Sequence, residues 1–216
     1  MEFHRIDLEQ YPRKEHYWHY RQTVPCTYSM TVTLDMTHML QKIKEKGFPF
    51  YPVIIYGISR VVNAHQEFRM ALDELGRLGY YDVVHPNYTI FHPKTETFSS
   101  LWTPYQENLS AFLRQYQENL VRYGDQPTAF SPMPDIPNQF FISCIPWVSF
   151  TEFHLNIQHG YNHFAPIFTI GKYQRSGEKI LLPLAVQVHH AACDGFHTAR
   201  LTNELQAWAD YFSLPE

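Results

Sequence analysis

The most informative stretch of the chain reads His189-His190-Ala191-Ala192-Cys193-Asp194-Gly195-Phe196-His197. The apolar residues before it, 180–188, indicate a largely buried strand, and the apolar side chains after it, at spacings of three to five, indicate an amphipathic helix. Asp194 and Gly195 are typical turn residues and supply the corner between the two elements. His190 is therefore expected where a rigid core holds it while its ring reaches a cleft.

Outward from this corner, helix and strand patterns are mixed without regular alternation. Helices are predicted over residues 13–22, 37–46, 53–65, 105–122 and 198–212, and strands over 27–34, 88–92, 97–101, 139–145, 164–173 and 179–188. Residues 124–137 hold four prolines and are predicted to form a surface loop. No Gly-rich phosphate loop follows a strand. The sequence favours an α+β fold, a two-layer α/β sandwich with a large mixed sheet in one domain over residues 1–216, rather than a Rossmann fold.

Composition argues against several classes of protein. A formal net charge of -4 argues against a nucleic-acid binder, because such proteins need a basic face to displace counterions.

The amino terminus does not resemble a secretion signal, and no apolar run approaches the roughly 18 residues of a membrane span, so a cytoplasmic protein is expected. The cysteines do not suggest a disulfide framework, and all three are expected to be reduced: Cys26, Cys144 and Cys193. Charged residues at only 18% leave apolar surface for a subunit interface or an apolar ligand.

The spacing His-x-x-x-Asp-Gly at residues 190–195 resembles the signature of coenzyme A-dependent acyltransferases. The longer string over residues 187–197 resembles the chloramphenicol acetyltransferase family. Six further segments match that family in the same order: Arg13-Lys14-Glu15-His16, Phe50-Tyr51-Pro52, Glu67-Phe68-Arg69-Met70, Thr95-Glu96-Thr97-Phe98-Ser99-Ser100-Leu101-Trp102, Pro146-Trp147-Val148-Ser149-Phe150 and Gly171-Lys172-Tyr173.

This resemblance implies an enzyme that moves an acetyl group from acetyl-CoA directly to the primary hydroxyl of chloramphenicol. It also implies a homotrimer with active sites at the subunit interfaces, in which one subunit presents His190 to a pocket built largely by its neighbour. The product of such a reaction is an inactivated antibiotic.

The catalytic residues implied are His190, Ser143 and Thr169. A neutral imidazole can take the proton from an attacking hydroxyl, and His190 is assigned this role of general base. Ser143 matches the family serine that stabilises the oxyanion, and Thr169 matches a threonine associated with the transition state through a bound water. Without the motif, His190 would be read as a hydrogen-bonded core histidine, and Ser143 and Thr169 as ordinary strand residues.

Asp194 could by its spacing be a triad partner of His190. The resemblance implies otherwise: Asp194 forms an ion pair with Arg13 that holds the active-site loop, and the imidazole is oriented by the backbone carbonyl of His190 itself. Asp194 and Arg13 are thus expected to be structural residues of the site.

Two binding regions are implied by motif position. Residues expected to line the chloramphenicol site are Tyr20, Val24, Tyr28, Phe98, Phe130 and Leu155. Tyr28 stands where many relatives carry phenylalanine. Residues expected on the coenzyme A side are Trp147, Lys172 and Tyr173, the rings by stacking and the lysine by its charge.

Four alternatives compete with this interpretation. A Cys193 thiolate could form an acyl-enzyme, but the resemblance implies direct transfer. Histidines near Cys193 could bind a metal ion, but the spacings typical of zinc sites are absent and no metal is expected. The acceptor could differ, as in dihydrolipoyl acyltransferases, which share His-x-x-x-Asp-Gly. The chain could also be an idle relative that only binds hydrophobic drugs, although the base and the serine are both present.

Overall fold

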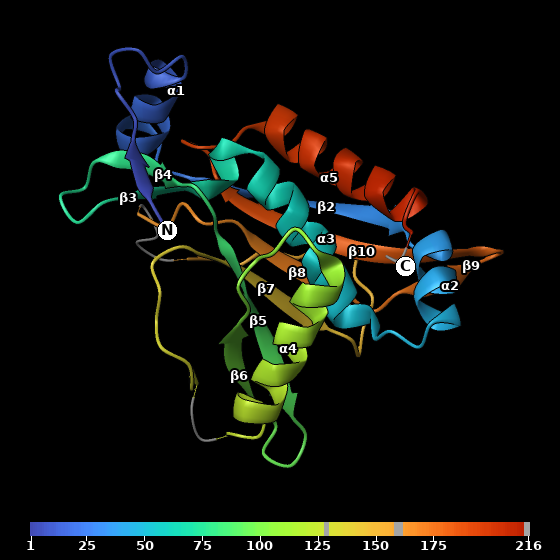
Figure 1. The fold of residues 1–216 in the computed structure, drawn as a ribbon. Coiled ribbons are helices and arrows are strands. Elements are labelled where there is room, and N and C mark those ends of the chain that lie inside the picture. Colours follow the sequence, from blue (N-terminus) through green and yellow to red (C-terminus); the bar gives the residue numbers. More distant parts are fainter. Residues whose placement is uncertain (128–129, 158–161, 214–216) are drawn as a thin grey trace.

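The computed structural model describes residues 1–127, 130–157 and 162–213. Its main sheet has seven strands, six of them in the order β2-β10-β8-β7-β5-β6 (Figure 1). Their bounds are β2 Thr27–Asp35, β5 His85–His92, β6 Thr97–Trp102, β7 Gln139–Ile145, β8 Ile167–Gly171 and β10 Lys179–His189. Strands β5, β7 and β8 are parallel, and the other pairings are antiparallel, so the sheet is mixed. The short strand β9, Gln174–Ser176, pairs with the beginning of β10.

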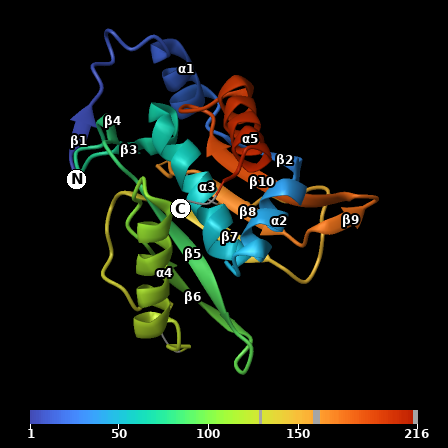
Figure 2. The same cartoon turned by 45° about the vertical axis from the view of Figure 1, so that its right-hand side comes forward.

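Four helices lie over one face of this sheet (Figures 1 and 2). They are α2 Thr37–Glu45, α3 Phe50–Ala64, α4 Leu109–Tyr123 and α5 Gly195–Asp210. The core lies between the two layers, where α3 is buried along most of its length and the rings of Phe140 and Phe168 meet edge to face. Gly57 of α3 lets Trp208 of α5 approach closely, because a Cβ at this position would clash with the indole ring. This arrangement confirms the predicted α+β sandwich with a large mixed sheet.

A second, small sheet was not predicted from the sequence. Strands β1 Phe3–Arg5, β4 Leu78–Tyr81 and β3 Met70–Leu72 pair antiparallel in the order β1-β4-β3. Each has only three or four residues, too few for a visible alternation of polar and apolar side chains. A 3₁₀ turn, Gln66–Arg69, joins α3 to β3.

Several element boundaries differ from the prediction for local chemical reasons. The predicted helix 13–22 is a short α1, Lys14–Trp18, followed by a π-helical turn, His19–Thr23. Helix α4 begins at Leu109 because Asn108 caps it, accepting a hydrogen bond from the Ala111 amide at 2.9 Å. Helix α3 begins three residues earlier than predicted, since a proline in the first turn needs no hydrogen bond for its nitrogen.

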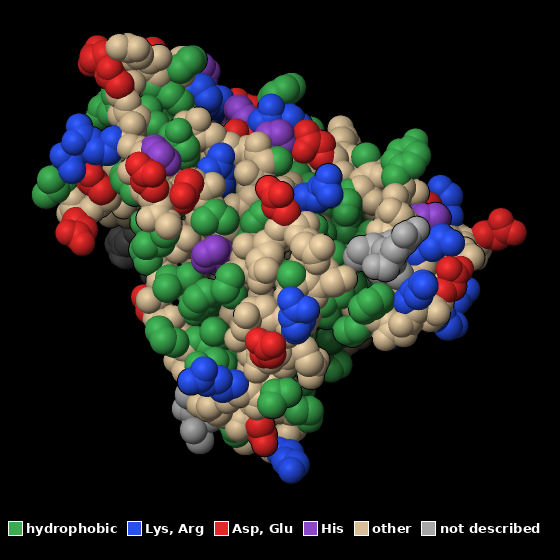
Figure 3. Space-filling view, viewed as in Figure 1, with side chains coloured by type: hydrophobic (Ala, Val, Ile, Leu, Met, Phe, Trp, Pro, Cys, Tyr) green, Lys and Arg blue, Asp and Glu red, His purple; other side chains and the backbone are tan. Residues whose placement is uncertain are grey.

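The predicted surface loop is confirmed over its described part, because residues 124–127 and 130–137 contain neither helix nor strand. Residues 128 and 129 lie outside the described residues. On the face seen in Figure 3, acidic and basic side chains are interspersed among apolar ones. No helix within the described ranges is long and apolar enough to cross a membrane.

Candidate active site

The corner that carries His190 is fixed by backbone hydrogen bonds. Strand β10 ends at His189, whose carbonyl accepts the amides of Ala192 and Cys193, both at 3.0 Å. The amide of His190 donates to the carbonyl of Cys26 at 3.1 Å. Hydrogen bonds within the turn and to the segment before β2 thus fix the backbone that carries the His190 side chain.

The two neighbouring histidines have different environments. His189 is buried, stacks on Phe164 with ring centroids 4.5 Å apart, and accepts the amide of Ala191 at Nδ1. His190 is half-buried, and its ring lies 3.7 Å from that of Tyr20 in a stacked arrangement. His189 is therefore part of the core, whereas His190 is accessible for chemistry.

The imidazole of His190 is oriented by a different carbonyl from the one expected. Its Nδ1 lies 3.0 Å from the carbonyl oxygen of Cys193, so the expectation that His190 is oriented by its own carbonyl is wrong. The turn brings the Cys193 carbonyl back toward the ring. A carbonyl oxygen only accepts, so Nδ1 carries the proton and Nε2 keeps its lone pair, as a general base requires.

Asp194 acts on the backbone and on Arg13 rather than on His190. One carboxylate oxygen accepts the Phe196 amide at 3.0 Å and caps α5, which explains why this helix begins at Gly195 and not at the predicted residue 198. The other oxygen pairs with Nη1 of Arg13, as the family resemblance implies. Burial alone would raise the pKa of Asp194, but the Arg13 hydrogen bond and the charges of His197 and Arg13 lower it overall.

The loop has a further anchor that sequence reasoning missed. Arg200 of α5 forms an ion pair with Glu67, whose backbone carbonyl also accepts the thiol of Cys193. Cys193 is only 1% exposed, and burial raises the pKa of its thiol well above the ordinary value. A buried thiol that keeps its proton is a poor nucleophile, which argues against an acyl-cysteine route.

Ser143 and Thr169 form a pair of hydroxyls in the middle of the sheet. They lie opposite each other on the parallel strands β7 and β8, with Oγ and Oγ1 3.1 Å apart. Thr169 is almost completely buried. This arrangement holds the Ser143 hydroxyl at a defined position at the edge of a cavity.

That cavity, of about 1030 Å³, brings together four of the predicted site residues. It is lined by Ser143 and by three apolar side chains expected to bind chloramphenicol: Phe98, Phe130 and Leu155. The two phenylalanine rings meet edge to face at 5.7 Å and form an apolar wall. Such a cavity suits a flat, largely apolar ligand.

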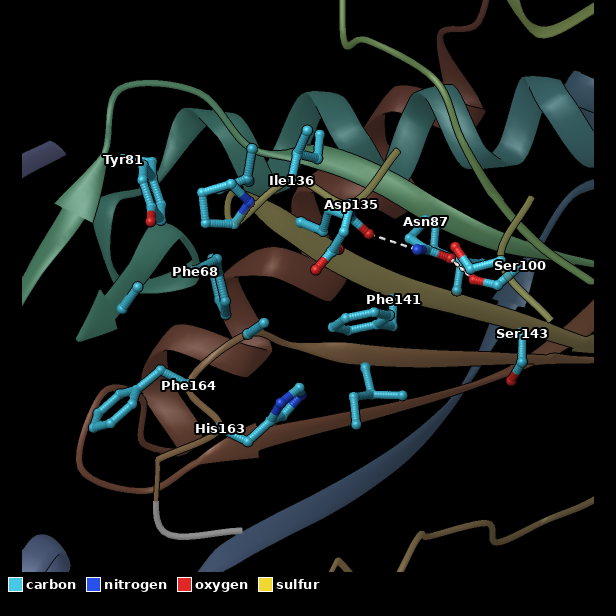
Figure 4. A pocket seen from close by; sticks show the side chains of 18 of the residues that line it. Phe68, Tyr81, Asn87, Ser100, Asp135, Ile136, Phe141, Ser143, His163 and Phe164 are labelled. Atoms are coloured by element: carbon cyan, nitrogen blue, oxygen red, sulfur yellow. Dashed lines mark hydrogen bonds between the residues drawn. The ribbon is translucent and has the colours of Figure 1, made fainter. Parts of the chain in front are cut away.

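The cavity also contains polar residues that sequence reasoning missed. Asn87 donates to the side-chain carbonyl of Gln139 at 2.5 Å and accepts from the hydroxyl of Ser100. Figure 4 shows Asn87 and Ser100 beside one another, on the same side of the view as Ser143. His163 lies across the cavity, and burial lowers its pKa. The sequence contains only a weak indication of these residues, because single polar residues within apolar strands are also common as buried, hydrogen-bonded residues without a binding role.

The residues expected on the coenzyme A side lie together at one edge of the sheet. Trp147 follows β7, and Lys172 and Tyr173 follow β8, whose parallel direction brings these ends to the same edge. The amide of Lys172 donates to the carbonyl of Val148 at 2.9 Å. All three side chains are exposed, so aromatic surface and a positive charge are available there to a ligand.

The remaining predicted residues lie at the opposite end, near His190. Tyr20 and Tyr28 contact its ring, and Val24 is exposed just after the π-helical turn; none of these three lines the large cavity. On β10, Ala185 pairs with Thr169, and His190 follows five residues later. At about 3.3 Å per residue, this places His190 roughly 16 Å along the sheet from the Ser143 and Thr169 pair. One chain alone therefore keeps the candidate base and the candidate oxyanion donor apart.

Residues 1–206 match the family model described as chloramphenicol acetyltransferase. The chain belongs to the chloramphenicol acetyltransferase family. Among its relatives, the chloramphenicol acetyltransferase of Proteus mirabilis is 52% identical over 205 residues, which are 95% of this chain and 94% of the relative. Members of this family are acyltransferases, so the predicted enzyme class is confirmed.

Solved structures agree with the fold. A chloramphenicol acetyltransferase aligns over 96% of this chain and all of its own, with a TM-score of 0.84 at 20% identity. The dihydrolipoamide acetyltransferase of Azotobacter vinelandii aligns over 91% of this chain and 86% of its own, with a TM-score of 0.64 at 17% identity. The chain thus shares its fold with a dihydrolipoamide acetyltransferase as well. Dihydrolipoyl acyltransferases, as noted above, also share the motif His-x-x-x-Asp-Gly.

Proposed function

We propose that this chain transfers the acetyl group of acetyl-CoA to the primary hydroxyl of chloramphenicol. The observation that carries the proposal is the 52% identity, over 95% of the chain, to a relative named for this reaction. The position of His190 adds to it, because Nδ1 donates to the Cys193 carbonyl and Nε2 is left able to accept a proton.

The chemistry proceeds by direct transfer. Nε2 of His190 takes the proton of the drug hydroxyl while the hydroxyl oxygen attacks the thioester carbonyl carbon. The Ser143 hydroxyl donates to the oxyanion of the tetrahedral intermediate, and Thr169 holds that hydroxyl through the 3.1 Å contact. When the intermediate collapses, the carbon–sulfur bond breaks and the departing sulfur takes the proton back from His190. The products are an acetyl ester and free coenzyme A.

The site is proposed to be shared between copies of the chain. A base and an oxyanion donor must both lie within about 3 Å of the reacting groups, whereas the sheet register separates His190 from Ser143 by roughly 16 Å within one chain. A second copy that presents His190 to the cavity would remove this separation. In such an assembly, the His190 end of each copy contacts the cavity of the next copy. Contacts between two different surfaces can close into a ring, and we propose a ring of three copies, a homotrimer.

The two ends of the shared site have suitable chemistry for the two substrates. We assign the apolar wall of Phe98, Phe130 and Leu155 to the aromatic ring of chloramphenicol. Trp147 and Tyr173 would stack on the adenine of acetyl-CoA, and Lys172 would face its phosphates. Location in the cytoplasm and a single domain over residues 1–216 remain predictions.

The direct experiment is a spectrophotometric assay of free thiol released from acetyl-CoA by the purified protein. We expect release with chloramphenicol, none without it, and release at least about 10²-fold slower from the variant His190→Ala. Dihydrolipoamide as acceptor, with the acetylated product identified by mass spectrometry, tests the competing reaction. A protein that acetylates this dithiol and leaves chloramphenicol unchanged would contradict the proposal.

A further inference from the structure

The contacts of Tyr28 connect His190 with helix α5. It lies at the beginning of β2, and its ring meets the imidazole of His190 edge to face, with centroids 5.0 Å apart. It does not line the cavity that Ser143 and Phe98 share, but it lines a smaller cavity together with Leu155. Its hydroxyl bonds instead to the hydroxyl of Thr198. The aromatic edge of Tyr28 therefore faces the base while its polar end is anchored in helix α5.

Thr198 connects the Tyr28 hydroxyl to the loop that carries His190. The side chain of Thr198 is completely buried in the first turn of α5. Its hydroxyl donates to the backbone carbonyl of Asp194 at 3.3 Å and adds to the bond that the Thr198 amide makes to the same carbonyl at 3.2 Å. Because the hydroxyl proton is used, the second hydrogen bond of this hydroxyl is one that Tyr28 donates to Thr198. Burial raises the pKa of Tyr28 to about 12, so the phenol keeps the proton that it donates.

The loop thus offers two consecutive carbonyls to two different partners. The carbonyl of Cys193 accepts from Nδ1 of His190, and the carbonyl of Asp194 accepts from Thr198. The two carbonyls are joined by one residue, so a shift of the second moves the first. A loosened Asp194 carbonyl would change the direction of the Cys193 carbonyl and with it the direction of Nε2.

We propose that Tyr28 and Thr198 form a positioning pair, whose hydroxyl–hydroxyl bond holds the loop 190–194 and the edge of the His190 ring at the angle needed for proton removal. This inference rests on the proposed function, since it requires His190 to be the base. It gives the Tyr28 hydroxyl a task other than contact with the drug. The hydroxyls of Tyr28 and Thr198 would act through His190 and would touch neither substrate nor the reacting atoms.

The test measures kcat and KM for both substrates in the variants Tyr28→Phe and Thr198→Val and in the double variant. Each single variant is expected to lower kcat about threefold to tenfold, the effect of one hydrogen bond, with KM for chloramphenicol nearly unchanged. The double variant should be no slower than the slower single variant, because both substitutions break the same bond. Thr198→Ser keeps the hydroxyl and should keep kcat.

A second tyrosine–threonine pair supplies matched controls. The hydroxyls of Tyr88 and Thr103 lie 2.8 Å apart, both side chains are fully buried, and neither contacts His190 or lines the large cavity. Tyr88→Phe and Thr103→Val should lower the thermal unfolding temperature while leaving kcat of the folded enzyme unchanged. These controls show what the loss of any buried tyrosine–threonine hydrogen bond does to the enzyme. The effect specific to the Tyr28–Thr198 bond is what remains beyond that.

Three results would overturn the positioning pair. The first is a rise in KM for chloramphenicol at constant kcat in Tyr28→Phe, which would mean that the hydroxyl contacts the drug. The second is additivity of the two substitutions, and the third is wild-type kcat in both single variants. If the wild-type protein itself releases no thiol with chloramphenicol, the proposed function fails and the pair fails with it; an active wild type with unaffected variants overturns the pair alone.

Discussion

The rings of Tyr20 and His190 stack with their centroids 3.7 Å apart and their planes 11° apart. Tyr20 is brought there by the π-helical turn, His19–Thr23, which follows α1. With Tyr20 on its face, Tyr28 at its edge and the Cys193 carbonyl on Nδ1, the imidazole is held before any substrate binds. An imidazole fixed in this way need not lose conformational freedom in the transition state when it acts as the proposed base.

Replacing His190 should separate catalysis from binding. We expect His190→Ala to lower kcat by at least about 10²–10⁴-fold, since no other group takes the proton, while chloramphenicol binding measured by calorimetry changes little. His189→Ala should mainly lower stability, because His189 is buried against Phe164. If the two substitutions exchanged these effects, the assignment of the base would be wrong.

Removal of Asp194 should have a pH-dependent effect on stability. The folded-state pKa of Asp194 lies below its ordinary value of 3.8, so its stabilising effect is complete above that value and is lost as pH falls through the lowered pKa. Asp194→Asn should cost about 1–3 kcal/mol near neutral pH, because the partly buried Arg13 loses its partner.

Thermal unfolding of wild type and Asp194→Asn, followed from pH 7 to pH 3, measures this difference in stability. The exposed carboxylate Glu45, paired with Lys42, provides the control Glu45→Gln, for which little effect is expected at any pH. A difference for Asp194→Asn that stayed constant or grew on acidification would contradict the account.

Much of the fold could be predicted from the sequence, because long elements carry a visible periodicity. Helix α4 has apolar side chains on one face, and β10 is an apolar run, so both were found close to their true positions. The strands β1, β3 and β4 were missed because their stability comes from pairing between segments far apart in the chain. Local pattern does not contain that information.

Motif position named candidate residues of the site, but it could not give their geometry. It predicted the Arg13–Asp194 ion pair, which the structure contains, and it named His190 and Ser143 as candidates. It did not find that the Cys193 carbonyl orients the imidazole, since this depends on how the turn closes. The positions of Asn87 and Ser100 in the cavity likewise follow from strand register, which the order of residues along one strand does not reveal.

The thiol of Cys193 should be dispensable for acetyl transfer. Cys193→Ala is expected to retain substantial activity, because the buried thiol is protonated and direct transfer needs no covalent intermediate. Incubation of the wild-type protein with acetyl-CoA alone should leave its mass unchanged. An acetyl adduct on Cys193 that chloramphenicol discharges would require a different mechanism.

Loss of the Ser143 hydroxyl should act on the transition state. Ser143→Ala is expected to lower kcat by roughly 10²–10³-fold with little change in KM, the usual cost of one oxyanion donor. Thr169→Val should have a smaller effect, and in the Ser143→Ala background it should have almost none, because the 3.1 Å contact then has no partner. Full additivity of the two substitutions would show that Thr169 does not act through Ser143.

The claim that one active site is built by two chains is tested most directly by complementation. His190→Ala lacks the base but keeps the cavity, and Phe98→Arg blocks the cavity but keeps the base; each alone should be inactive. Refolded together in equal amounts, random mixed trimers should regain about a quarter of the wild-type activity, because about one interface in four joins an intact base to an intact cavity. Mixed trimers, demonstrated by native mass spectrometry, that regain no activity would contradict the shared site, as would an active monomer in light scattering.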